Sequence, residues 1–161
     1  MLRFVSTFTN RLDAKGRVSI PAAFRAVLER DVYRGPEAAE GDRSAVSVYC
    51  YPSLDAPALD AGGERLATAI DGLLAGLPDY SDERDELSVA LYGDVHLLAV
   101  DADGRIVLPE ALRAHADLEA HVTFVGLGQK FQIWSPERFA ARRDAAREKV
   151  RDVSKLLAVK K

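Results

Sequence analysis

The sequence LDAKGRVSIPAAFR at residues 12–25 decides the fold of this chain, because residues 100–113 repeat it as VDADGRIVLPEALR. The two stretches are offset by 88 residues without a gap. Asp, Gly, Arg and Pro recur at the same places, and the apolar positions stay apolar. Repetition at a fixed spacing is the mark of a chain built from copies of one structural unit. The sequence therefore predicts two related halves.

Each copy of the repeat is expected to form a strand, a tight turn, a second strand and a short helix. Lys15-Gly16 and Asp103-Gly104 have the composition of two-residue hairpin turns, in which glycine supplies the positive φ angle. The strand after each turn is apolar or alternating, and it is followed by a proline, which suits the start of a helix. Short helices are therefore predicted over residues 22–28 and 110–116.

Each half is also predicted to close with strands in which apolar residues alternate with period two. These strands are expected over residues 46–51 in the first half, and over residues 122–125 and 131–134 in the second. The segment Gly126-Leu127-Gly128 is predicted to be a hairpin loop between the last two strands. A phosphate-binding loop is disfavoured there because no helix follows it.

Four segments are expected along the chain. Residues 7–54 and 93–138 are the two repeats, and residues 139–161 are a basic C-terminal helix or tail. Residues 55–92 are predicted to be a helical insert with two helices. Small β units have unpaired edges and little room for a core, so the two repeats are expected to intertwine into one composite domain.

Charge is distributed unevenly along the chain, although the net charge is only −3. Residues 1–30 carry +4 and residues 111–161 carry +5, whereas residues 31–110 carry −12. A net negative charge weakens nonspecific attraction to DNA. It still permits a local basic face, because charges beyond about 8–10 Å are largely screened. The composition therefore does not exclude a nucleic-acid partner.

Several other classes of protein are disfavoured. Cys50 is the single cysteine, so no internal disulfide or redox pair is possible and a reducing, cytosolic setting is expected. The first residues lack the apolar core of a secretory signal, and no apolar run is long enough to span a bilayer. The acidic residues form no recognisable acid–base pair. We therefore expect no catalytic residues, no cofactor and no small-molecule substrate.

The three histidines are predicted to be structural. His96, His115 and His121 have no metal-ligand spacing with cysteine or acidic partners. Cys50 lies on an alternating strand and is also predicted to be structural. No metal site is expected.

The doubled Asp-x-x-Gly-Arg turn, its downstream proline and the closing aromatics Tyr51 and Trp134 resemble the MraZ family, from about Phe4 to Arg143. One such turn would be a weak signal, but two with matching downstream residues are specific. The family consists of bacterial transcriptional regulators built from two AbrB-like, or SpoVT-AbrB, halves. The resemblance implies a mainly β protein with helices (α+β). Its two intertwined swapped-hairpin β units would form one pseudo-twofold barrel, with inserted and C-terminal helices added.

The resemblance also implies a function. It indicates a sequence-specific DNA-binding regulator that binds short repeats in the promoter of the division and cell-wall gene cluster as a ring-like homo-oligomer. Such a protein would be cytoplasmic and nucleoid-associated, with no membrane contact. The alternative is a protein-interaction module, since AbrB-like units also occur in antitoxins that grip a toxin.

The DNA-contacting segment of the family maps onto Asp13 with Arg17 and onto Asp101 with Arg105. Arg17 is the first predicted contact, because its planar fork suits guanine or phosphate, and Lys15 adds a point charge beside it. Arg105 is the third predicted contact.

The other motif residues are expected to shape the turns. Asp13 and Asp101 cannot favourably face a phosphate, so they are predicted to accept backbone N–H bonds or to hold an arginine in place. Gly16 and Gly104 supply the turn conformation. Asp103 replaces the lysine of the first turn and puts negative charge at the second tip. A direct contact between the second turn and DNA is therefore less favoured.

Two basic features have more than one interpretation. Arg25 and Arg113 share a repeat position near a helix start, where they could form a salt bridge, cap a neighbouring turn or contact phosphate. The basic C-terminal helix could be a solvated face, an extra DNA contact or a disordered tail.

Overall fold

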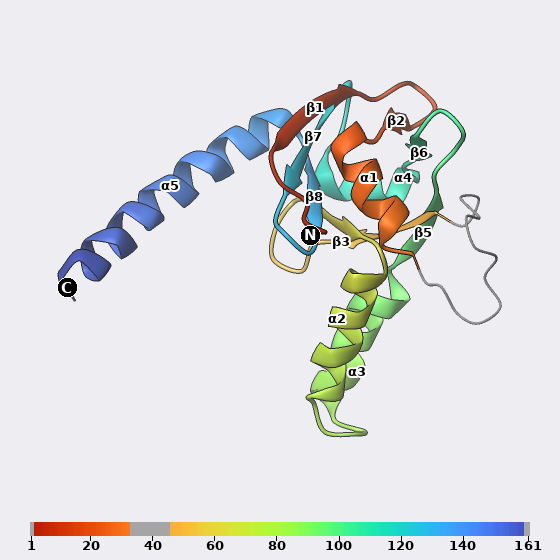
Figure 1. Ribbon diagram of the computed structural model, residues 1–161. Helices are drawn as coiled ribbons and strands as arrows, with labels where there is room; N and C mark the ends of the chain where they lie inside the picture. The colour runs from red at the N-terminus through yellow and green to blue at the C-terminus, as the bar shows by residue number, and fades with distance from the viewer. Residues whose placement is uncertain (1, 33–45, 160–161) are drawn as a thin grey trace.

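The computed structural model describes residues 2–32 and 46–159 (Figure 1). Within these residues five α-helices, one π-helical turn and eight strands follow one another. In chain order they are β1 (Thr7–Arg11), β2 (Arg17–Ser19), α1 (Ala22–Arg30), β3 (Ser47–Pro52), β4 (Leu59–Gly62), α2 (Glu64–Ala75), α3 (Asp82–Ser88), η2 (Val89–Gly93), β5 (His96–Ala99), β6 (Arg105–Val107), α4 (Glu110–Ala116), β7 (His121–Gly126), β8 (Phe131–Trp134) and α5 (Pro136–Val159).

The strands form two antiparallel sheets accompanied by helices, which confirms the α+β class. More of the described residues lie in helices than in strands. The larger sheet has six strands in the order β1-β7-β8-β4-β3-β5, and the smaller sheet pairs β2 with β6. Both sheets join strands of the first half to strands of the second. Closure of these strands into a swapped-hairpin barrel stays a prediction.

The elements of the repeat form where the sequence predicted them. The first predicted helix is α1, which extends to Arg30, and the second is α4 over residues 110–116. The segment from Gly126 to Gly128 lies in the hairpin between β7 and β8, where the Leu127 N–H donates to the Lys130 carbonyl at 2.9 Å. The hairpin-loop prediction is therefore confirmed.

The segment predicted as a helical insert, residues 55–92, contains a strand that the sequence did not indicate. β4 pairs with β3 on one side and with β8 on the other, and all four of its residues are buried. Its sequence, LDAG, is short and lacks alternation, so its intrinsic strand preference is weak. Pairing on both sides decides its conformation. The two predicted helices follow as α2 and α3, and α3 continues into η2.

The core is an aromatic cluster to which both halves contribute. Phe24 of α1 lies 5.3 Å from Phe4, 5.1 Å from Phe131 and 6.3 Å from Phe124 between ring centroids. All four rings are at most 1% exposed. Edge-to-face and tilted contacts of this kind add to the free energy gained by burying the rings. α1 is thereby held against β7 and β8 of the other half.

Two helical features project from this strand-rich body (Figure 1). The α2–α3 hairpin extends to one side and is attached to the sheet by a second apolar cluster that includes Tyr51, Leu66 and Leu91. α5 leaves in a different direction as a single helix of 24 residues. None of the helices in the described residues is long and apolar enough to cross a membrane.

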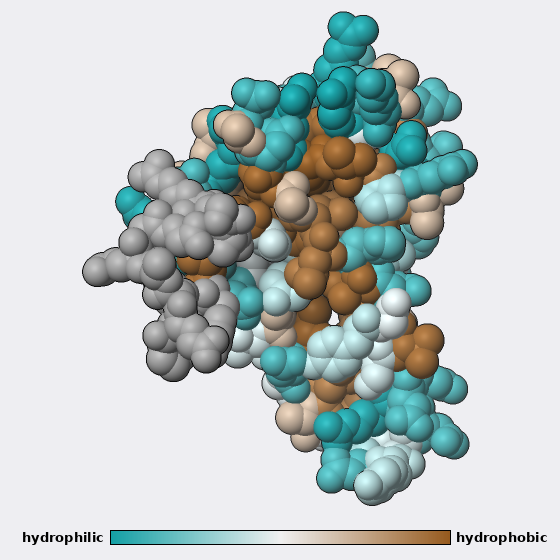
Figure 2. Space-filling model, turned by 90° about the vertical axis from the view of Figure 1, so that its right-hand side faces the viewer, coloured by the Kyte–Doolittle hydropathy of each residue, from teal (hydrophilic) through white to brown (hydrophobic). Residues whose placement is uncertain are grey.

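The surface is not uniformly polar. Figure 2 shows hydrophobic residues at the surface on the side of β5 and β6, between the strand-rich body and the α2–α3 hairpin. Leu97 of β5 is 63% exposed and Val107 of β6 is 52% exposed.

Candidate nucleic-acid interface

Asp13 organises the first turn through its carboxylate. Its Oδ1 accepts the backbone N–H of Lys15 at 2.9 Å and that of Arg17 at 2.8 Å. Its Oδ2 accepts Nε of Arg17 at 2.7 Å. The backbone N–H of Arg17 is the largest cause that holds the pKa of Asp13 below its ordinary value. The carboxylate therefore stays ionised at neutral pH and fixes the Arg17 side chain.

Asp101 does the same in the second turn. Its Oδ1 accepts the N–H groups of Asp103 and Arg105 at 2.8 and 2.9 Å, and its Oδ2 accepts Nε of Arg105 at 3.1 Å. The pKa of Asp101 is lowered, chiefly by the backbone N–H of Arg105. One contact has no counterpart in the first turn, because Asp103 Oδ2 accepts Nη2 of Arg105 at 3.2 Å.

Both turns are three-residue loops, so the prediction of two-residue turns is wrong. The Asp13 N–H donates to the Arg17 carbonyl at 3.0 Å, and the equivalent bond from Asp101 to Arg105 is 2.9 Å. Gly16 has φ +83°, a left-handed conformation that suits the last residue of such a loop. The aspartate carboxylate stabilises the longer loop, because it binds the N–H groups two and four residues further on.

The β2–β6 ribbon joins the two turns, which lie at its opposite ends. β2 runs antiparallel to β6, with Arg17 opposite Val107 and Ser19 opposite Arg105. Side chains alternate between the two faces of such a ribbon, so these four share its outer face. The middle pair, which faces the core and is 1% exposed, consists of Val18 and Ile106. Arg17 and Arg105 are therefore diagonal neighbours on one surface.

Each turn also accepts a hydrogen bond from the other half. The Gly16 carbonyl accepts the Leu108 N–H at 2.8 Å, and the Gly104 carbonyl accepts the Ile20 N–H at 3.0 Å. These pairs are related by the same 88-residue offset as the repeat. The symmetry of the sequence is thus present in the hydrogen bonds of the ribbon.

The structure gives the repeated arginines Arg25 and Arg113 a supporting position at these turns. Arg113 lies beside Gly16, and its Nε donates to the Leu108 carbonyl at 3.0 Å. Arg25 lies beside Gly104. Of the three interpretations open from the sequence, a contact with a neighbouring turn is the one that this geometry matches.

The two predicted DNA-contacting arginines differ in how much of the guanidinium is free. Within the described residues, Arg17 is bonded only through Nε, so its two terminal nitrogens point to no protein acceptor. Arg105 is held at Nε and again at Nη2. The side chains are 39% and 35% exposed. Lys15, the third predicted contact, is exposed at the tip of the first turn.

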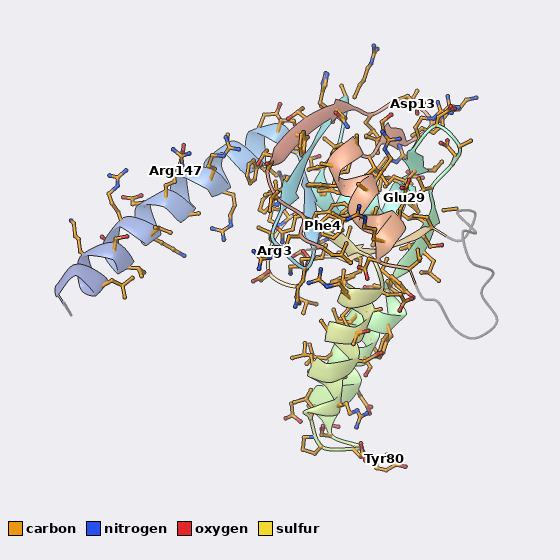
Figure 3. All side chains as sticks on the ribbon, viewed as in Figure 1. Arg3, Phe4, Asp13, Glu29, Tyr80 and Arg147 are labelled. Atoms are coloured by element: carbon orange, nitrogen blue, oxygen red, sulfur yellow. The ribbon has the colours of Figure 1, made fainter. Side chains whose placement is uncertain are left out.

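The charges of the turns are opposite. Residues 13–17 contain two cations and one anion, whereas residues 101–105 contain one cation and two anions. Asp13 lies at the outer edge of the strand-rich body, away from the α2–α3 hairpin and α5 (Figure 3). The first turn therefore carries a net positive charge and lies away from the acidic insert.

Ser19 is a surface residue of the ribbon that the sequence did not single out. It lies on the outer face opposite Arg105 and two residues after Arg17, and its carbonyl accepts Nδ2 of Asn10 at 2.7 Å, which ties β2 to β1. The alternation of Arg17, Val18 and Ser19 would have placed it there.

The described residues hold no cluster of three or more metal-ligating side chains and no exposed cysteine. Cys50 is buried, and burial raises the pKa of its thiol to about 12. Nε2 of His115 lies 3.2 Å from the Ala56 carbonyl.

Comparison with known proteins points to one family. The family model described as "MraZ protein, putative antitoxin-like" matches residues 91–155. "Transcriptional regulator MraZ" of Azorhizobium caulinodans is 52% identical over 157 residues, which cover 98% of this chain and 92% of that protein. The protein of the same name from Beijerinckia indica is 52% identical, with 98% and 89% covered. That of Gluconobacter oxydans is 41% identical, with 96% and 88% covered.

Proposed function

The chain belongs to the MraZ family of transcriptional regulators, and from this premise we propose that it binds promoter DNA in a sequence-specific way through the outer face of the β2–β6 ribbon. The observation that carries the proposal is the hydrogen bonding of the Arg17 guanidinium. Its guanidinium is fixed by Asp13 through Nε, while both terminal nitrogens are free of protein acceptors in the described residues. A pre-positioned fork of this kind matches the two acceptors of guanine or the oxygens of a phosphate.

The shape of the site supports this role. The major groove of B-DNA admits a two-stranded β-ribbon, and β2 with β6 is such a ribbon. Lys15 at the tip of the first turn adds a cation suited to the phosphate backbone. Base recognition is thus assigned to Arg17 and backbone contact to Lys15.

The second turn has a weaker role in this proposal. Arg105 is held by Asp101 and Asp103, and Asp103 would face the DNA with negative charge. A carboxylate near a phosphate is repelled, so Arg105 contributes less than Arg17 to affinity. The second turn mainly completes the ribbon through the Gly104 carbonyl.

A regulator with one favourable turn per chain gains affinity by assembling. Several ribbons on one homo-oligomer, ring-like as the family resemblance implies, would bind repeated DNA sites together. Their effective concentration then raises the overall affinity, provided that the repeats match the spacing of the ribbons. The repeats are those of the promoter upstream of the division and cell-wall gene cluster, which places the protein in the cytoplasm at the nucleoid.

The test is footprinting and fluorescence anisotropy on the DNA upstream of the chain's own gene. Arg17→Ala should weaken binding by about 1–3 kcal/mol, roughly five- to 150-fold, because a bidentate contact is lost. Arg105→Ala should weaken it less. Arg30→Ala removes the same charge from the exposed end of α1 and serves as the control.

Two results would contradict the proposal. One is unchanged DNA binding by a folded Arg17→Ala protein. The other is a stoichiometric protein partner that co-purifies with the chain while promoter fragments are not retained, which would favour the antitoxin-like alternative. Wild-type affinity should also fall steeply with salt, since contacts to phosphates release counterions.

A further inference from the structure

A surface hollow of about 680 Å³ lies between α5 and the β7–β8 hairpin. Its floor is apolar and includes Trp134, Phe139 and Val125, the first and last of which are 3% and 8% exposed. Its wall is basic, because Arg142 and Arg147 line it from α5. We call this hollow the α5 groove. An apolar floor below arginines is suited to an aromatic side chain within an acidic segment.

The groove continues beyond α5. Leu127, Lys130 and Asp55 also line a neighbouring hollow of about 570 Å³ beside α2. Leu127 is 50% exposed. The two hollows therefore adjoin, and together they offer a protein segment a longer surface than either hollow alone.

α5 itself lacks a partner over most of its length within the described residues. Its side chains from Arg147 to Lys155 are all exposed. Among them Val150 and Val153 are 60% and 52% exposed. Together with Ala146 and Leu157 they repeat at alternating spacings of four and three, the pattern of a helix that packs against another element.

The tip of the α2–α3 hairpin has the complementary chemistry. Tyr80 is 98% exposed and is held at φ +62°, a left-handed conformation that is unusual for a tyrosine. The turn around it is ordered: Oγ of Ser81 donates to the Pro78 carbonyl at 2.7 Å and accepts the Arg84 N–H at 3.3 Å. Arg84 also pairs with Asp79. Exposed acidic residues surround the tyrosine, namely Asp79, Asp82, Glu83, Asp85 and Glu86.

We propose that the α2–α3 tip of one copy docks in the α5 groove of a second copy, with Tyr80 on the apolar floor and the acidic side chains facing the arginines. A second copy is the chosen partner because the α2–α3 tip and the α5 groove have complementary charges. Residues 64–93 contain seven acidic and two basic residues, whereas residues 136–159 contain seven basic and four acidic ones. Both partners of the contact are thus present on every chain.

The contact is between chains because the two surfaces lie far apart on one chain. In Figure 3 Tyr80 is at the end of the α2–α3 hairpin, while Arg147 is on α5 at the other side of the molecule. A contact between two different surfaces is head-to-tail, and it closes into a ring where the rotation between neighbours permits. The inference rests on the homo-oligomer of the proposed function and deepens it by naming the subunit contact. The residues named in this contact do not include those of the β2–β6 ribbon.

The test reverses charge on each side of the contact. Asp82→Lys with Glu83→Lys reverses the tip, and Arg142→Glu with Arg147→Glu reverses the groove. Each pair should reduce the mass in solution, measured by light scattering, from that of an assembly to the 17.6 kDa of a single chain. A chain that carries all four substitutions should regain the assembly, because opposite charges face each other again.

A second variant tests the contact without reversing any charge, so that an effect on folding can be told apart from loss of the contact. Tyr80→Ala removes the aromatic ring from a fully exposed site, and it should raise the dissociation constant of the assembly at least tenfold while the circular dichroism spectrum stays unchanged. Unchanged mass in Tyr80→Ala and in both reversed pairs would overturn the contact. A groove-reversed protein that keeps its mass but loses DNA would also overturn it, because the groove would then face DNA.

The outcome is separable from that of the proposed function. A wild-type protein that is a single chain in solution and on DNA would overturn the contact and the oligomer together, while DNA binding through Arg17 would still be measurable on one site. Failure of Arg17→Ala to affect DNA binding, with the assembly intact, would overturn the ribbon and leave the contact in place.

Discussion

Arg113 on α4 of the second half lies against Gly16 in the turn of the first. Its Nε would be 3.2 Å from a methyl group placed on Gly16, and it donates to the Leu108 carbonyl at 3.0 Å. Leu108 in turn donates its N–H to the Gly16 carbonyl. Arg25 has the corresponding place beside Gly104. Each turn of the proposed DNA-binding ribbon is therefore supported by the opposite half of the chain.

Gly16→Ala is expected to destabilise the fold by more than the cost of a left-handed alanine. That conformation alone costs about 1–2 kcal/mol. The added methyl group would also lie 2.8 Å from the Leu108 carbonyl oxygen, which is backbone and cannot move without breaking the ribbon. Gly128→Ala is the matched control, because Gly128 has φ +87° but open space around it. Denaturant unfolding should show the larger loss of unfolding free energy for Gly16→Ala. Equal losses would contradict the close contact between this position and the Leu108 carbonyl.

Arg113→Met is expected to cost about 1–3 kcal/mol of unfolding free energy, because the buried Leu108 carbonyl loses a charged donor. Methionine retains much of the apolar stem. Arg25→Met provides the comparison, since Nε of Arg25 is buried without a hydrogen-bond partner among the described residues. Its replacement should cost less than that of Arg113. The reverse order in urea titrations would show that the two arginines are not placed as described.

The local parts of this site could be predicted from the sequence. The repeated Asp-x-x-Gly-Arg motif indicates a turn, because aspartate binds nearby N–H groups and glycine adopts a left-handed conformation. The prolines mark the starts of α1 and α4. Local rules cover these features since each involves residues only a few positions apart.

The parts that join the two halves could not be predicted in the same way. The pairing of β2 with β6 and the contact of Arg113 with Gly16 link residues about 90 positions apart, and no spacing rule connects them. β4 is a similar case, because its conformation depends on pairing with β3 and β8 rather than on its own residues. Tyr80 had no motif around it, and the features that mark it, its exposure and its left-handed backbone, are visible only in the structure.

Acid should weaken the turns only at low pH. The pKa of Asp13 is lower in the folded protein than its ordinary value of 3.8, so the carboxylate stabilises the fold fully above that value. The stabilisation is lost as the pH falls through the lower, folded pKa. The difference in unfolding free energy between wild type and Asp13→Asn should therefore be constant from pH 7 to pH 5 and shrink below pH 4. A difference that already shrinks near pH 6 would contradict the hydrogen bonds assigned to Asp13.

Asp103→Lys is expected to strengthen DNA binding, because it removes the two features that set the second turn apart from the first. Asp103 contributes negative charge at the tip and occupies Nη2 of Arg105 at 3.2 Å. The substitution changes residues 101–105 from one cation and two anions to the two cations and one anion of residues 13–17. Each additional phosphate contact should steepen the plot of log affinity against log salt by about 0.9.

The measurement is anisotropy on the promoter repeats at several salt concentrations. Asp94→Lys makes the same charge change at an exposed residue just before β5 and serves as the control. If net charge alone governs affinity, both variants strengthen binding equally. If the second turn lies on the DNA, Asp103→Lys gains more, and Lys15→Asp in the first turn loses affinity. If Asp103→Lys and Asp94→Lys gain the same affinity, the second turn does not contact the DNA. Of the two turns, only the first, with Lys15 and Arg17, would then supply basic contacts.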